Sequence, residues 1–198
     1  MNGEEQIFNS KDDCFVKGIE KDDIKAIEDC LTDLPPTYDG VPPELKRTND
    51  MGQTYLHIAL SKHANYNIIK LLIEYGSNVN AQDINNETPL HVCLVFPDRK
   101  DNKKEDYENI QDYFEYLRKI IPLLLENNAN KTLKNINGDT PYYQALESQH
   151  HTNLRFPKDI LKLLRNKFYK IKKTIKTKNK KNKKTLKKQT LRTRTHKK

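Results

Sequence analysis

The sequence lacks the features that mark membrane-spanning and secreted proteins. No apolar run approaches the roughly 18 residues that a membrane-spanning helix needs. The first residues, MNGEEQ, are acidic and polar, unlike the basic and apolar start of a signal peptide. We therefore expect an intracellular protein of the cytoplasm, the nucleus or both, without a transmembrane segment.

Cysteine is scarce, and its spacing does not match the usual cysteine-based architectures. The chain has 3 cysteines, Cys14, Cys30 and Cys93, and none of them forms a C-x-x-C pair. An odd number at these spacings indicates neither a disulfide framework nor a zinc site. We expect all three to be reduced thiols that act as small core residues, and we expect no metal and no cofactor.

Catalytic and nucleotide-binding motifs are also missing. The sequence contains no Walker loop, no G-x-G-x-x-G, no G-x-S-x-G and no H-E-x-x-H. Carboxylates are abundant, but they do not form a site by themselves, because a catalytic acid and base need a cleft that shifts their pKa values. We expect no catalytic residues and a protein that is not an enzyme.

The sequence does contain a repeated string. TYLHIAL begins at Thr54, TPLHVCL at Thr88 and TPYYQAL at Thr140. The first two lie 88 − 54 = 34 residues apart, a period typical of repeat arrays. Residues 54–80 add a second apolar segment, IIKLLI, and so predict a short helix, a turn and another helix. Neither helix can bury its apolar face alone, so such units must stack.

These strings resemble the T-P-L-H-x-A hallmark of ankyrin repeats, which recur every 33 residues or so. The resemblance covers residues 12–167, and the best match is Thr88-Pro89-Leu90-His91. It implies an all-α solenoid of about four helix-turn-helix units with short β-turn tips. In ankyrin proteins the motif histidine bonds to the backbone of the neighbouring repeat. His57 and His91 are therefore expected to be structural.

The repeats divide the chain into segments. Two short apolar patterns indicate a degenerate capping repeat, and the stretch after it holds 4 of the 9 prolines, which favours a loop. The predicted order is a flexible segment at 1–11, the capping repeat at 12–33, the Pro-rich loop at 34–48, ankyrin repeats at 49–81, at 82–133 with an insert at 97–115 and at 134–167, and a basic tail at 168–198.

The repeats depart from the family pattern at identifiable positions. Tyr55 replaces the motif proline, which should weaken the start of that helix slightly. Asn86 takes the place of the turn glycine, because Asn tolerates a left-handed backbone. The first helix of that repeat should stop at Pro97. The second half of the insert should extend the next helix forward, and Pro122 should kink it.

Charge is divided unevenly along the chain. Residues 165–198 hold 17 Lys or Arg and no Asp or Glu. The whole chain has 36 basic and 27 acidic residues, so the remainder holds 36 − 17 = 19 basic against 27 acidic, or −8. A block of like charges repels itself and has little apolar surface to bury. We therefore expect a disordered tail.

Three functions remain open for this tail, besides a purely solubilising one. Its lysines fit a short nuclear-import pattern, which an import receptor would bind, and their charge would attract nucleic acid by counterion release. Phe168, Ile171 and Ile175 among the lysines would also suit an anionic membrane surface. The residues predicted to act in import or polyanion binding are Lys178, Lys180, Lys181, Lys183, Lys184, Lys187 and Lys188.

In ankyrin proteins the turn tips and the first helices of the repeats line a concave face that binds partners. The resemblance therefore places the candidate binding surface on the turn tips of this chain. Ile84 and Ile136 occupy equivalent tip positions between Asp and Asn residues, where an exposed apolar side chain suits a protein contact. The insert at 97–115 is a second candidate, because long loops in compact arrays are often functional. The predicted contact residues are Asp50, Gln53, Asp83, Ile84, Asn85, Glu87, Asn135, Ile136, Asn137 and Asp139.

The predicted function is that of a monomeric adaptor that binds a protein partner through the tips, with the tail for nuclear targeting or polyanion attachment. The alternative is a protein that binds nucleic acid or an anionic membrane through the tail. The Asn-, Lys- and Ile-rich composition is similar to that of ankyrin proteins of large DNA viruses of protists. That resemblance implies a role in engaging host proteins inside the host cell.

Overall fold

The structure is a computed structural model of the chain, and it describes residues 13–32, 41–96, 110–151 and 155–166. Three of the predicted segments lie wholly or largely outside these ranges, and a fourth lies partly outside them; all of the lysines predicted for import or polyanion binding are outside. These segments are the flexible segment at 1–11, the first part of the loop at 34–48, most of the insert at 97–115 and the tail at 168–198.

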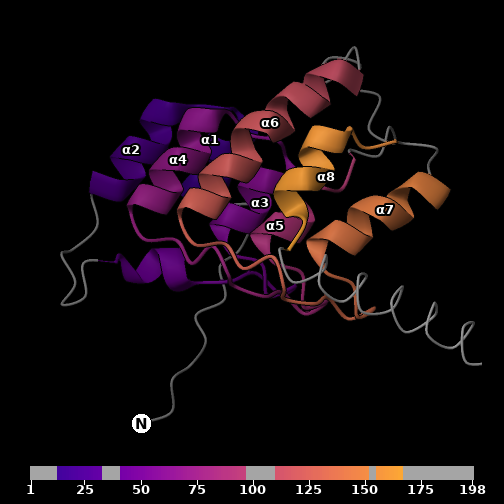
Figure 1. Cartoon of the computed structure of the whole chain (residues 1–198). Coiled ribbons are helices and arrows are strands. Elements are labelled where there is room, and N and C mark those ends of the chain that lie inside the picture. The colour runs from indigo at the N-terminus through magenta and orange to yellow at the C-terminus, as the bar shows by residue number, and fades with distance from the viewer. Residues whose placement is uncertain (1–12, 33–40, 97–109, 152–154, 167–198) are drawn as a thin grey trace, which may run out of the picture. The chain divides into compact units, whose positions relative to one another are not determined.

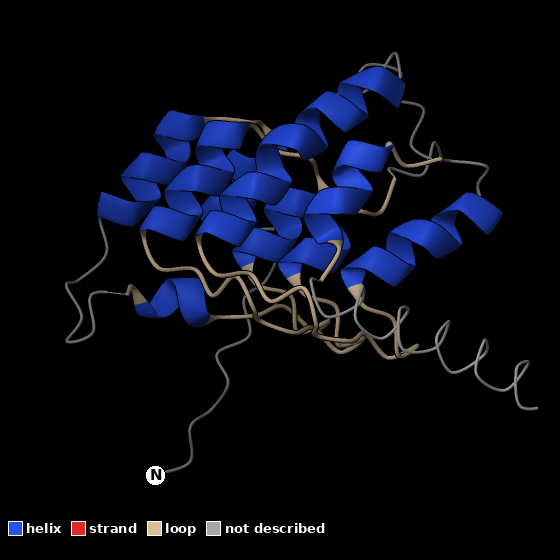
Figure 2. Ribbon diagram, viewed as in Figure 1, coloured by secondary structure: helices blue, strands red, loops and turns tan. Residues whose placement is uncertain are grey.

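The described residues form eight α-helices and one 3-10 turn, and they contain no strand (Figure 2). In chain order the helices make four successive pairs, so the predicted all-α array of helix-turn-helix units is confirmed. The helices are α1 (Cys14–Glu20), α2 (Ile24–Thr32), α3 (Tyr55–Ser61), α4 (Tyr66–Glu74), α5 (Pro89–Val92), α6 (Ile110–Glu126), α7 (Pro141–His151) and α8 (Lys158–Leu164), and the 3-10 turn is η1 (Pro43–Lys46).

The helix pairs stack into two layers. The first helices α1, α3, α5 and α7 contact one another in sequence, and so do the second helices α2, α4, α6 and α8 (Figure 1). The loops that join one pair to the next gather along one side of the helices (Figure 2). The stack therefore brings turns that are far apart in the sequence next to one another.

The core follows from the spacing of apolar residues within each helix. On α4, Ile68, Ile69 and Leu72 recur at helical spacing and are all fully buried. Leu56 and Leu60 do the same on α3. A buried side chain of this size contributes about 1.5 to 3 kcal/mol relative to an exposed one. Since each face is covered by neighbouring repeats, the stacking itself provides the stability.

The Pro-rich loop is more ordered at its end than the sequence suggested. Residues 43–46 form the 3-10 turn η1, which follows Pro42 and begins with a proline that presets the backbone for a tight helical start. Leu45 is buried in the core, and Val41 lies against Gly76. The end of this segment therefore packs onto the array instead of looping away from it.

The repeat that carries the insert has unequal helices. α5 ends at Val92, so the prediction that it would run to Pro97 is wrong. α6 begins at Ile110, which confirms that the second half of the insert extends this helix forward, and it continues as one helix across Pro122. The short first helix leaves space that other side chains must fill.

Aromatic side chains fill that space. The hydroxyl of Tyr113, near the start of α6, donates to the carbonyl of Cys93 at 3.3 Å, just beyond the end of α5. Its ring lies 5.0 Å from the ring of Phe96, edge to face, and 6.3 Å from that of Phe156. Edge-to-face contacts of this kind stabilise beyond simple burial. The extension of α6 therefore completes the core where α5 is short.

Cys14 and Cys30 face each other across the α1–α2 pair. Their Cα atoms are 6.3 Å apart and their sulfurs are joined as a disulfide. The prediction that all three cysteines are reduced thiols is therefore wrong for these two, while Cys93 is free and buried. The sequence did not indicate this pairing, because it depends on the antiparallel packing of two helices and not on C-x-x-C spacing.

Tyr55 links the first regular repeat to the capping pair. Its side chain is fully buried, its ring centre lies 4.7 Å from that of Phe15, and its hydroxyl donates to the carboxylate of Asp13. Asp13 also caps the start of α1 by accepting from the backbone of Phe15. The residue that replaces the motif proline thus adds a contact between repeats that proline could not make.

Candidate functional site

Each tip turn is closed by one side-chain oxygen of its first residue. In the middle tip, Asp83 Oδ1 accepts from the backbone N–H groups of Asn85 and Glu87, both at 2.8 Å. The oxygens of Asn49 and Asn135 do the same in the other two turns, at 2.9 to 3.1 Å. The three turns therefore share one plan, and they comprise residues 49–53, 83–87 and 135–139.

The fourth residue of each turn has a left-handed backbone. Its φ is +69° at Gly52, +56° at Asn86 and +82° at Gly138. Glycine adopts this conformation without strain, and asparagine adopts it more readily than other residues with a β-carbon. The prediction that Asn86 takes the place of the turn glycine is confirmed.

Neighbouring tips are joined by backbone hydrogen bonds. The N–H of Ile84 donates to the carbonyl of Met51 at 3.1 Å, and the N–H of Ile136 donates to the carbonyl of Asn85 at 2.8 Å. The three turns therefore form a ladder, which we call the tip ladder. It fixes the two isoleucines at the same position of adjacent turns.

Two histidines attach the tip ladder to the helices. His57 Nδ1 lies 3.2 Å from the backbone N–H of Thr54 and accepts from it, so the proton resides on Nε2, which donates to the carbonyl of Glu87 at 3.1 Å. His91 repeats the arrangement one unit further and donates to the carbonyl of Asp139, also at 3.1 Å. The expected structural role of both histidines is confirmed.

Both imidazoles are held in the neutral form. Burial lowers the pKa of His57 and of His91, although the carbonyls that accept from Nε2 and the charge of Asp83 act in the opposite direction. A neutral ring is what the geometry requires, since Nδ1 must keep its lone pair to accept from the threonine backbone. These histidines are therefore positioning groups and not proton donors for a reaction.

The predicted contact residues differ in how far they reach solvent. Asp83 and Asn135 are only 6% and 7% exposed, and their side-chain oxygens hold the turns, so they shape the surface instead of presenting themselves to a partner. Ile84 and Ile136 are 56% and 66% exposed, the two highest values among the exposed large apolar residues in the described part of the chain. The remaining predicted residues are exposed or partly exposed: Asp50, Gln53, Asn85, Glu87, Asn137 and Asp139.

One tip residue was missed by the sequence analysis. Met51 is 46% exposed, and its carbonyl accepts the hydrogen bond from Ile84. An alignment of the three turns could have found it, because Met51 is the third residue of its turn, the position that Asn85 and Asn137 occupy in the other two. With it, the tip ladder carries three exposed apolar side chains.

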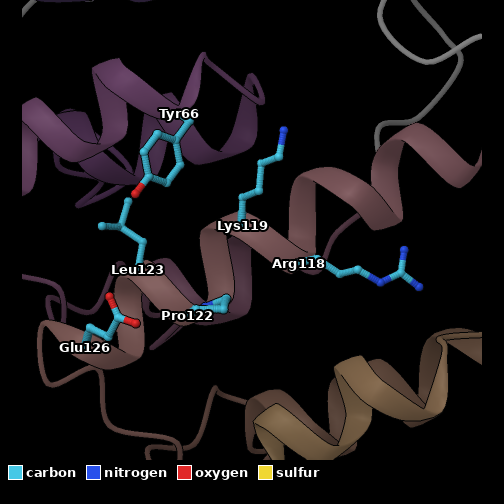
Figure 3. A pocket seen from close by; sticks show the side chains of 6 residues that line it. All are labelled: Tyr66, Arg118, Lys119, Pro122, Leu123 and Glu126. Atoms are coloured by element: carbon cyan, nitrogen blue, oxygen red, sulfur yellow. The ribbon is translucent and has the colours of Figure 1, made fainter.

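A separate pocket of about 290 Å³ lies in the layer of second helices, between α4 and α6 (Figure 3). Tyr66 of α4 faces Lys119 and Leu123 of α6 across it, and Pro122 and Glu126 complete its wall with Arg118. Arg118 is engaged by Asp159 of α8 at 2.7 Å and by Glu115 at 2.7 Å.

Neither a metal-binding cluster nor a membrane-spanning helix is present in the part of the chain that the structure describes. It contains no group of three or more His, Cys, Asp or Glu side chains placed to hold a metal ion. Among the same residues, no helix combines the length and the apolar character needed to cross a membrane.

Comparison with known proteins agrees with this architecture. Residues 39–93 match the family of ankyrin repeats (many copies). An ankyrin repeat protein of Fowlpox virus (strain NVSL) is 44% identical over 53 residues, which are 26% of this chain and 28% of that protein, so the match spans little more than a quarter of the viral relative. The chain therefore contains ankyrin repeats at residues 39–93, and its four stacked helix pairs and its two motif histidines bonded to the next tip extend the same arrangement beyond the matched residues.

Proposed function

We propose that this chain is a non-enzymatic adaptor that binds a protein partner through the tip ladder. Ankyrin repeats are in general protein-interaction modules. The observation that carries the proposal for this surface is the exposure of Ile84 and Ile136 on turns that are joined by backbone hydrogen bonds. Apolar side chains on a backbone that is already held in place can be buried by a partner without the entropic cost of ordering that backbone.

The contact surface follows from exposure. Ile84 and Ile136 would be its apolar centre with Met51, and polar groups of the same turns would form its rim. Asp83 and Asn135 would support it from below through their bonds to the turns. The rim residues are Asp50, Gln53, Asn85, Glu87, Asn137 and Asp139.

The test is affinity capture by the full chain, followed by mass spectrometry, with and without the substitutions Ile84→Arg and Ile136→Arg. The matched control carries Tyr66→Arg and Tyr75→Arg, because these side chains are 37% and 38% exposed at the two ends of α4. We expect the tip variant to lose its partners at least tenfold and the control to keep them. Equal capture by both variants, with unchanged circular dichroism, would contradict the proposal.

We further propose that the basic tail sets location, because 17 basic residues without an acidic one are concentrated in residues 165–198. Lys180, Lys181 and Lys183 would bind an import receptor, or the whole block would attach the protein to a polyanion. Fusion of residues 165–198 to a fluorescent protein should concentrate it in the nucleus. Diffuse signal through the cell would count against import and against attachment to an anionic membrane.

The alternative is that the tail does the binding and the repeats only carry it. Deleting residues 165–198 separates the two functions, because an adaptor keeps its protein partners without the tail. The adaptor is also proposed to act as a monomer in the cytoplasm or nucleus. Light scattering of the purified chain checks the monomer, and loss of capture on deletion of the tail would favour the alternative.

A further inference from the structure

The side chains of the tip ladder define the chemistry of the partner more closely. We propose that the tip ladder binds a protein segment in which lysine or arginine side chains stand beside apolar ones. This inference rests on the proposed function, since it names the class of partner for the same surface. It excludes acidic segments and nucleic acid as ligands of the tips.

The charge of the tip ladder favours a basic ligand. The three turns contain four carboxylates, from Asp50, Asp83, Glu87 and Asp139, and they contain no lysine or arginine. Residues 1–164, taken together, are also acidic, at −8. Phosphate groups and acidic side chains would meet like charge along the entire ladder, whereas a basic segment would meet complementary charge.

Three of these carboxylates are available to a ligand. Within the described part of the chain, Asp50, Glu87 and Asp139 make no ion pair, and each reaches solvent at least in part. By contrast, Oδ1 of Asp83 already accepts two hydrogen bonds from the backbone of its own turn. Three carboxylates, one on each turn, can therefore accept hydrogen bonds from lysine or arginine without first losing a partner.

Apolar and acidic side chains alternate along the tip ladder. Ile84 follows Asp83 and lies against the preceding turn, since a β-carbon on Gly52 would come within 3.4 Å of its side chain. Glu87 closes the same turn, and the next turn repeats the order with Ile136 and Asp139. A purely basic ligand would leave the isoleucines uncovered, and a purely apolar ligand would bury carboxylates without partners. A ligand with both kinds of side chain satisfies the surface.

The test selects a library of random 12-residue peptides, displayed on phage, against the purified full chain. Each recovered peptide is then tested on a variant with Ile84→Ser and Ile136→Ser, and only peptides that lose binding are scored. Serine is neutral, so this filter does not favour either charge. Acidic peptides that bind the basic residues 165–198 instead of the tips would be retained by the variant and would drop out of the score.

The scored peptides should be rich in lysine and arginine. A labelled copy of the tightest one should bind about tenfold more weakly to a variant with Asp50→Asn, Glu87→Gln and Asp139→Asn, since each exposed ion pair contributes about twofold. These substitutions leave the backbone carbonyls of Glu87 and Asp139 free to accept from the histidines. Binding should also weaken as salt is raised.

Three results would overturn the inference: scored peptides that are neutral or acidic, binding that the charge variant leaves unchanged, or no tip-dependent peptide at all. None of these would decide the proposed function, because protein capture and its loss in the Ile84→Arg, Ile136→Arg variant test that separately. If capture fails as well, the tip ladder is not the binding surface. If capture succeeds, only the class of partner is wrong.

Discussion

The helix pair α3–α4 is a regular repeat, and the next pair, α5–α6, is a modified one. In the regular repeat, α3 has 7 residues and α4 has 9, whereas in the modified repeat α5 has 4 and α6 has 17. Yet the histidine bond from each repeat to the following tip is the same length, 3.1 Å. The helices can therefore change length without disturbing the tips, as long as the core beneath them is refilled.

The largest expected effect would break the modified repeat. Tyr113→Ala should lower the free energy of unfolding by about 4 kcal/mol, because it removes a fully buried ring from the cluster that replaces the missing part of α5. Tyr113→Phe should cost only about 1 kcal/mol, since it keeps the ring and loses the hydrogen bond to Cys93. Urea unfolding followed by circular dichroism measures both. A loss below 1 kcal/mol for Tyr113→Ala would show that the ring does not complete the core.

A smaller effect tests whether the tips are held alike in both repeats. His57→Ala and His91→Ala should each cost about 2 kcal/mol, because each leaves a buried threonine N–H without its acceptor and the next tip without its donor. The same urea titration gives both values. If one histidine costs more than twice as much as the other, the two attachments are not equivalent.

The same histidines predict a dependence on pH. Their pKa values are lowered in the folded state, so the unfolded chain takes up protons first as pH falls. Their contribution to stability is complete above the ordinary histidine pKa of 6.5 and is lost progressively below it. Measuring the free energy of unfolding of the wild type and of a His57→Gln, His91→Gln variant between about pH 5 and 8 isolates the contribution of the two histidines to the pH dependence. The raised pKa of Glu87 acts in the opposite sense, but it is present in both proteins.

The contrast between the repeats also shows what sequence can predict. The tips could be located because Ile84 and Ile136 occupy equivalent positions relative to a repeated string, and the histidine bonds follow from the family resemblance. The burial of Asp83 and the pairing of Cys14 with Cys30 could not be predicted, because both depend on how close two chain segments come in space. Local spacing determines the turns, while packing decides which of their atoms remain available.

The smallest expected effect compares one turn with another. Asn86 holds a left-handed backbone at φ +56° where the neighbouring turns have glycine, so Asn86→Gly should be neutral or raise stability by about 0.5 kcal/mol. Gly52→Ala should lower it by about 1 to 2 kcal/mol, since a β-carbon there meets a left-handed backbone and would lie 3.2 Å from the N–H of Ile84, which donates to Met51. Thermal unfolding resolves a difference of this size. If Gly52→Ala were harmless, the left-handed turn would not be what sets the spacing between tips. If it destabilises the fold and also weakens partner capture, the spacing of the tip ladder is what the partner recognises.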